Sequence, residues 1–161
     1  MELYFLRHAR AMKREEWTGL DERRPLTERG IALMKGEATA LARLDLGLDL
    51  IVTSPLERAR HTAEIAAHAL GMKKKVVQSA ALAPGFSVKK LAQLLASRPK
   101  ATKVMLVGHE PDFSLVVSEL AGGGRIVCKK GSLARVDVAG RTIRKGAGRL
   151  VWLLQPEVLA R

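Results

Sequence analysis

Short runs of apolar residues alternate along the chain with longer segments in which apolar residues recur every three or four positions. Almost uninterrupted apolar runs of this length are typical of strands that are covered on both faces of a sheet. The pattern predicts strands over residues 3–6, 49–53, 74–78, 103–108, 132–138 and 149–155. A glycine-rich basic loop joins the last two runs, so we expect these to form a hairpin at the end of the sheet.

The apolar residues at helical spacing predict four helices, over residues 27–44, 56–70, 87–97 and 112–120. Gly71 is well suited to end the second of these helices, and Pro99 follows the third. Strands and helices that alternate in this way indicate an α/β fold. We expect a single three-layer domain over residues 1–161, in which a mostly parallel central sheet carries helices on both faces.

The composition agrees with one globular domain. Apolar residues make up 47% of the 161 positions, which is enough to build a core. No apolar stretch approaches the roughly 20 residues that span a bilayer, and no secretion signal precedes the first strand, so we expect a cytoplasmic protein without membrane contact. Cys128 is the only cysteine, which excludes an internal disulfide and predicts a structural thiol.

The net charge of +12 comes entirely from the second part of the chain. Residues 1–50 hold nine basic and nine acidic side chains, whereas residues 51–161 hold nineteen and seven. Such an excess favours anionic partners: phosphate esters, acidic proteins or nucleic acid. The densest basic run, residues 128–149, has no aromatic residue for stacking on bases, and no DNA-binding motif is evident. A basic nucleic-acid-binding protein is therefore the weaker, non-enzymatic alternative.

Candidate chemistry follows three of the predicted strands. Arg7 and His8 come directly after the first strand, and His109 follows the fourth within "GHEPDF". Ligands of open α/β sheets bind beyond the carboxyl ends of the strands. We therefore expect His8 and His109 to approach each other at that edge, although about a hundred residues separate them in the sequence.

The segment "TSPLERARHTA" follows the second strand and reads as a helix start. Ser54 is a suitable N-cap, Pro55 suits the first helical position, and Glu57 would complete a capping box. This arrangement puts Arg58 in the first turn, near the free N–H groups and the positive end of the helix dipole. A helix start with a nearby arginine favours an anion such as phosphate.

Several other kinds of site lack support in the sequence. His61 and His68 lie seven residues apart on one helix, and no third ligand at a suitable spacing completes a metal site. Neither of the glycine-rich nucleotide-binding patterns is present, and the serine hydrolase pattern is absent as well.

Taken together, Arg7-His8, "TSPLERARHTA" and "VGHEP" resemble the histidine phosphatase superfamily, whose members carry an RHG-type motif, an SPLxRAxxTA segment and a later Gly-His pair. The segments "RRPLTERG" (residues 23–30) and "GHEPDFS" are most similar to its SixA-type phosphohistidine phosphatase branch. The resemblance extends from residue 1 to about residue 120. It implies a phosphoglycerate mutase-like fold.

The resemblance also implies a mechanism. His8 would attack phosphorus as a neutral imidazole and carry the phosphoryl group as phosphohistidine, with its other ring nitrogen held by an acceptor. Arg7, Arg58 and His109 would bind the phosphoryl oxygens. This cluster supplies the positive charge, so we expect neither a metal ion nor another cofactor. Because all four residues are present, a catalytically inactive family member is not expected.

Two positions depart from the family pattern. Ala9 replaces the glycine of the RHG motif; a positive φ there would cost on the order of 1 kcal/mol, and we expect instead that alanine fits the backbone. Many members have a glutamate general acid after the third strand, whereas "ALAPGFS" (residues 81–87) has no carboxylate. The remaining candidates for a proton donor are Glu15, Glu16, Glu110 and Asp112, of which we expect the last two to cap a helix instead.

The missing acid bears on the substrate. Alkoxide leaving groups need protonation, whereas an imidazole nitrogen can be protonated from solvent beforehand. We therefore expect a protein that carries phosphohistidine as the substrate. A small phosphomonoester or a pyrophosphate is the alternative, but so short a chain leaves little to form a substrate cap, and an open site suits a protein-borne phosphoryl group.

Overall fold

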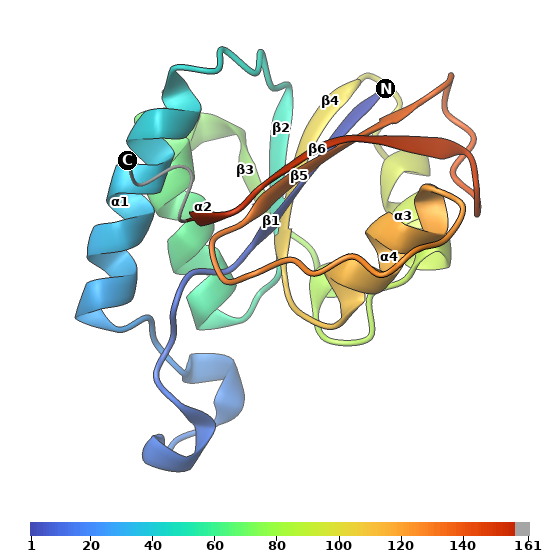
Figure 1. Ribbon diagram of the computed structural model, residues 1–161. Coiled ribbons are helices and arrows are strands. Elements are labelled where there is room, and N and C mark those ends of the chain that lie inside the picture. The colour runs from blue at the N-terminus through green and yellow to red at the C-terminus, as the bar shows by residue number, and fades with distance from the viewer. Residues whose placement is uncertain (157–161) are drawn as a thin grey trace.

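The computed structural model describes residues 1–156, which form a six-stranded sheet with helices on both faces (Figure 1). The strands are β1 (Glu2–Arg7), β2 (Leu50–Thr53), β3 (Val76–Gln78), β4 (Lys103–Gly108), β5 (Leu133–Val138) and β6 (Gly148–Leu154). The main helices are α1 (Glu28–Ala42), α2 (Glu57–Ala69), α3 (Val88–Ala96) and α4 (Asp112–Leu120). All the predicted elements are present, with ends that differ from the predicted ends by at most two residues.

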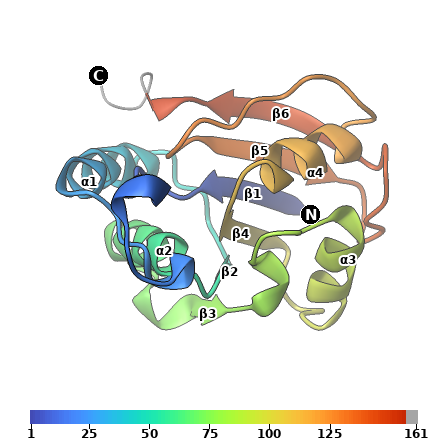
Figure 2. The same cartoon turned by 90° about the horizontal axis from the view of Figure 1, so that it is seen from below.

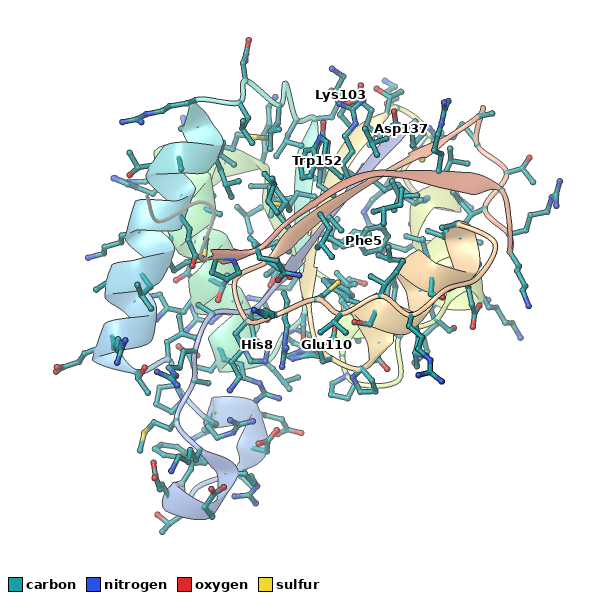
Figure 3. The ribbon with its side chains drawn as sticks, in the orientation of Figure 1. Phe5, His8, Lys103, Glu110, Asp137 and Trp152 are labelled. Atoms are coloured by element: carbon teal, nitrogen blue, oxygen red, sulfur yellow. The ribbon has the colours of Figure 1, made fainter. Side chains whose placement is uncertain are left out.

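The strand order is β3-β2-β4-β1-β5-β6. The first four strands in this order are parallel, while β5 is antiparallel to β1, and β6 pairs antiparallel with β5. The expected terminal hairpin is therefore confirmed. Parallel neighbours bring their carboxyl ends to one edge, and Figure 3 shows His8 and Glu110 at this lower edge, whereas Lys103 and Asp137 lie at the upper one.

Each face of the sheet has its own apolar core. Helices α1 and α2 cover one face, where Tyr4, Leu6 and Met105 point, and helices α3 and α4 cover the other, toward which Leu3 and Phe5 point. Side chains alternate between the two faces along a strand, and both faces are buried, which explains the uninterrupted apolar runs in the sequence. None of the helices in the described part of the chain is long and apolar enough to cross a bilayer.

The segment between β1 and α1 projects beyond the carboxyl edge of the sheet (Figure 1). It contains two short 3-10 helices, η1 (Arg14–Glu16) and η2 (Asp21–Arg23). Viewed from below, it passes in front of α1 and α2 (Figure 2). This segment contacts α2 through Asp21, whose carboxylate accepts from Arg58.

Candidate active site

The two histidines that follow β1 and β4 lie side by side at the carboxyl edge of the sheet. The parallel register places Arg7 opposite Gly108, and the backbone N–H of His8 donates to the Gly108 carbonyl over 3.0 Å. His109 is the first residue after β4, and the centroid of its ring lies 5.2 Å from that of the His8 ring. The predicted approach of the two imidazoles is confirmed, and the register of neighbouring strands is its cause.

His8 is held with its Nδ1 atom 2.8 Å from the carbonyl oxygen of Ala9. A carbonyl can only accept a hydrogen bond, so Nδ1 carries the hydrogen and Nε2 keeps its lone pair in the neutral ring. Burial lowers the pKa of His8 to about 3; the Ala9 carbonyl opposes this shift, while His109, Arg58 and Arg7 add to it. His8 is therefore a neutral imidazole with an unprotonated Nε2 at neutral pH.

Ala9 replaces the glycine of the family motif without backbone strain. Within residues 1–156, Asp45 is the one residue other than glycine with a positive φ, so Ala9 has an ordinary backbone conformation. The Ala9 N–H donates to Thr62 Oγ1 over 3.0 Å, and the Thr62 hydroxyl donates to the carbonyl of Arg58. The expectation that alanine fits is confirmed, and this pair of bonds joins the His8 loop to α2.

Ser54 does not cap α2, contrary to the prediction. The helix begins at Glu57 with Leu56 as its N-cap, and no side chain of the described residues caps it. The predicted capping box is therefore wrong, and Glu57 instead forms an ion pair with Arg60. The register of β2 and β4 places Ser54 next to His109, where its hydroxyl lies 2.8 Å from His109 Nε2. Ser54 Oγ also accepts from the nearby backbone N–H of Leu56 over 3.3 Å, so it joins the start of α2 to His109.

Arg58 lies in the first turn of α2, where it is buried and held by Asp21. Its two terminal nitrogens donate to the Asp21 carbonyl over 2.8 Å and to Asp21 Oδ2 over 3.0 Å. Arg24 Nε donates to the other carboxylate oxygen of Asp21 over 2.8 Å. Partial burial opposes ionisation of Asp21, but the hydrogen bond from Arg24 and the charge of Arg58 lower its pKa overall. Asp21 therefore orients both guanidinium groups.

Asp21, Arg24 and Ser54 belong to this cluster although the sequence does not identify them as site residues. Arg24 lies in "RRPLTERG" and Ser54 in "TSPLERARHTA". Both segments are part of the resemblance to the family, so the resemblance could have identified these two residues as members of the site. Asp21 lies outside the matching segments, and its contact with Arg58 joins residues 37 positions apart.

Arg7, the last residue of β1, is fixed by the loop that precedes β5. Its terminal nitrogen donates to the carbonyl of Cys128 over 2.8 Å, and its own carbonyl accepts from the Gly131 N–H over 3.2 Å. Burial lowers the pKa of Arg7, but the guanidinium still carries its charge at neutral pH. The charge therefore stays at the sheet edge beside His8.

Three of the clustered side chains have a buried nitrogen without a partner. Nε of Arg7, Nε of Arg58 and Nδ1 of His109 make no hydrogen bond to any residue within 1–156. Burying a polar group without a partner costs free energy, so such groups are typical of a site that binds acceptor atoms of a ligand. Two guanidinium groups among them favour an anionic ligand.

The four carboxylates considered as proton donors lie in two places. Glu15 and Glu16 are exposed in η1, where Glu16 pairs with Lys13 over 3.1 Å. Glu110 and Asp112 follow β4 directly and lie at the start of α4.

Glu110 caps α4 as the sequence predicts, because its carboxylate accepts from the backbone N–H of Ser114 over 3.1 Å and from the Ser114 hydroxyl over 2.6 Å. The same expectation is wrong for Asp112. Asp112 Oδ2 accepts from the backbone N–H groups of Gly85 and Phe86 over 2.7 and 3.0 Å. Asp112 thereby connects α4 to the loop of residues 81–87, which contains no carboxylate.

The other side chains considered in the sequence do not form a site. Cys128 is fully buried, and burial raises the pKa of its thiol, as expected of a structural cysteine. His61 and His68 are both on α2. Residues 1–156 contain no group of three or more His, Cys, Asp or Glu side chains arranged to hold a metal ion.

The chain is thus an α/β protein with a cluster of arginine and histidine side chains at the carboxyl edge of its sheet. The family model of the histidine phosphatase superfamily (branch 1) matches residues 3–83. The chain belongs to this superfamily, and it is a phosphatase by class.

Similar proteins extend the comparison. An uncharacterized protein of Picosynechococcus sp. is 42% identical over 126 residues, which cover 76% of this chain and 74% of that one. The structure of the protein histidine phosphatase SixA complexed with tungstate superposes with a TM-score of 0.86, at 23% identity, over 99% of each chain. The α-ribazole phosphatase from Shigella flexneri superposes with a TM-score of 0.76, at 19% identity, over 97% of each chain. The predicted phosphoglycerate mutase-like fold and the SixA-type resemblance are confirmed.

Proposed function

We propose that this phosphatase uses His8 as its nucleophile and removes the phosphoryl group from phosphohistidine on a protein. The observation that carries the first part is the orientation of His8, whose Nδ1 is bonded to the Ala9 carbonyl while Nε2 is unprotonated. Around it, Arg7, Arg58 and His109 have donors without partners. This combination supplies a nucleophile and an anion site at the same place.

In the first step, the Nε2 lone pair of His8 forms a bond to phosphorus while the bond from phosphorus to the substrate nitrogen breaks. The positive charge that develops on the His8 ring is stabilised by the Ala9 carbonyl, which accepts from Nδ1. The departing imidazole takes its proton from solvent before or during cleavage. Water then attacks the phosphohistidine, which releases inorganic phosphate and restores neutral His8.

The phosphoryl oxygens accept hydrogen bonds from Arg7, Arg58 and His109 in this mechanism. Donors that are already in place stabilise the charge of the transition state without reorganisation. Donation from His109 Nδ1 requires the proton to be on that nitrogen, so Nε2 has to accept. The Ser54 hydroxyl, 2.8 Å from Nε2, is placed to donate that bond.

The substrate part of the proposal rests on the carboxylates near the site. The loop of residues 81–87 has none, Glu110 is bonded to Ser114, and Asp112 is bonded to two backbone N–H groups of that loop. A site without a free acid suits a leaving group that needs no protonation by the enzyme. Imidazole is such a leaving group, whereas an alkoxide is not.

A substrate panel in the presence of EDTA tests this function. We expect the purified protein to release phosphate from a phosphohistidine peptide faster than from a small alkyl phosphate or from pyrophosphate. Because the arginine and histidine side chains supply the positive charge, chelation should leave every rate unchanged. Loss of activity with EDTA that a divalent ion restores would contradict the metal-free mechanism. Faster turnover of a phosphomonoester or pyrophosphate would assign the alternative substrate class.

The pH dependence of catalysis should show the low pKa values of the two histidines. His8 has to be neutral to attack, and burial lowers its pKa to about 3 and that of His109 to about 4. A lowered pKa keeps the ring neutral as the pH falls, so kcat/KM for p-nitrophenyl phosphate should persist well below pH 6.5, after correction for protonation of the substrate. Circular dichroism at each pH would show that the fold is intact. An acid limb near pH 6.5, the value of an unperturbed histidine, would contradict this expectation.

A further inference from the structure

A groove of about 540 Å³ opens beside Arg7, on the side of the site that faces α1. Five basic residues, Arg7 among them, line it together with apolar ones, and we call it the basic groove. It is defined by Arg10, Arg29, Leu33, Lys129, Lys130 and Pro156. Arg7 and Ala9 also line it, so the groove begins where the His8 loop ends.

One wall of the basic groove is held by the start of α1. The backbone N–H of Thr27, the N-cap of α1, donates to the carbonyl of Arg10 over 3.0 Å. Gly30 in the first turn lies so close that a Cβ atom there would overlap this carbonyl. The absence of a side chain therefore lets α1 pack directly on the segment that follows His8, which fixes Arg10 and Arg29 on neighbouring parts of the wall.

The opposite wall is the loop that holds Arg7. The carbonyl of Cys128 accepts from the Arg7 guanidinium, and the N–H of Gly131 donates to the carbonyl of Arg7. Lys129 and Lys130 lie between these two anchored positions. The beginning of the basic run of residues 128–149 is thus attached to the rim of the active site.

Basic side chains outnumber acidic ones among the described residues that line this groove. Burial lowers the pKa of Lys130, and the charges of Arg7, Arg10 and Arg24 lower it further. Glu37 is the acidic side chain that lines the groove within the described residues. Cations held close together repel one another, and an anionic partner bound between them would reduce this electrostatic repulsion.

We propose that the basic groove binds an acidic segment of the protein whose phosphohistidine enters the site. This inference rests on the proposed function and specifies the partner. The lining mixes cations with the apolar surfaces of Leu33, which is 43% exposed, and Pro156. A polypeptide with acidic and apolar side chains complements both, whereas a small polyphosphate would leave the apolar part unused. No aromatic residue lines the groove within residues 1–156, so bases of a nucleic acid would find no stacking partner.

Two synthetic peptides test the proposal. Both carry a central histidine and differ only in four flanking residues, which are glutamate in one and glutamine in the other. Fluorescence anisotropy with the unphosphorylated peptides measures binding independently of catalysis. We expect the glutamate peptide to bind about tenfold more tightly at low ionic strength, with an advantage that disappears as salt is added. Equal affinities would overturn the proposal.

Matched variants locate the binding. The double variant Arg10→Gln/Lys130→Gln should lose the preference for glutamate but hydrolyse p-nitrophenyl phosphate at the wild-type rate, because neither side chain belongs to the phosphoryl site. The control Lys74→Gln/Lys89→Gln removes the same charge from exposed positions on other elements and should keep the preference. If the groove variant keeps the preference for glutamate, the assignment is overturned. The same holds if a single-stranded oligonucleotide of equal charge displaces the labelled glutamate peptide at a lower concentration than the unlabelled glutamate peptide does.

The phosphorylated forms of the two peptides separate this inference from the proposed function. We expect both to be hydrolysed, with the glutamate peptide favoured through a lower KM. If neither releases phosphate while p-nitrophenyl phosphate does, the proposed substrate class is wrong, and the binding measurements still report on the groove. If both are hydrolysed with equal KM, the phosphohistidine assignment stands and the groove assignment fails.

Discussion

Replacement of His8 by alanine should reduce phosphatase activity by about 10⁴-fold or more, the loss expected when a nucleophile is removed. The structure gives the reason, because His8 is a neutral imidazole whose Nδ1 is bonded to the Ala9 carbonyl. Within residues 1–156, the one imidazole that contacts the His8 ring is that of His109. The Nε2 atom of His109 already lies 2.8 Å from the Ser54 hydroxyl, so we do not expect it to replace His8 as the nucleophile. Release of phosphate from a phosphohistidine peptide and from p-nitrophenyl phosphate measures the loss.

The covalent intermediate provides the control for this result. Wild-type protein quenched during turnover should carry a phosphoryl group that is labile in acid and stable in alkali, as a phosphoramidate is. His8→Ala should carry none, and His68→Ala, which removes an exposed histidine at the end of α2, should behave as wild type. An active His8→Ala protein, or a phosphoryl group stable in acid, would mean that another residue is the nucleophile.

The rate should fall steeply as the pKa of the leaving group rises, because the proposed mechanism has no enzyme acid that protonates the leaving group. Phosphohistidine should have a kcat/KM at least a hundredfold above that of an alkyl phosphate of similar size, with aryl phosphates between them. The physical cause is that imidazole and phenolates of low pKa leave without a proton, whereas an alkoxide does not. The measurement is kcat/KM across a series of phosphate esters, together with a phosphohistidine protein.

Four substitutions serve as controls for a concealed acid. Glu15→Gln, Glu16→Gln, Glu110→Gln and Asp112→Asn should each change the aryl phosphate rate by less than about tenfold. Glu110 and Asp112 are the sharper tests, since their carboxylates accept bonds from Ser114 and from the loop of residues 81–87. A preference for the alkyl ester, or a hundredfold loss from one of these substitutions, would reveal an acid and contradict the substrate proposal.

Local patterns were sufficient to predict the elements of the fold. The apolar run of β4 predicts a strand over residues 103–108, which is where the strand lies, because a strand buried on both faces needs apolar residues throughout. The helix that ends before three glycines is likewise predicted at residues 112–120. Placing His8 and His109 after strands predicted their approach, since parallel neighbours in a sheet end at one edge.

The hydrogen-bond partners of several site residues depend on contacts between distant segments, which the local patterns do not predict. Ser54 reads as a helix cap when only its neighbours in the chain are considered, but the pairing of β2 with β4 places it against His109. Asp21 follows a segment without apolar periodicity, and its bond to Arg58 depends on how the segment between β1 and α1 folds back on α2. The start of the basic run lies beside the site because the Arg7 guanidinium donates to the carbonyl of Cys128. Periodicity reports which face of an element is buried, whereas a hydrogen bond between elements depends on register and approach, and only the folded chain specifies these.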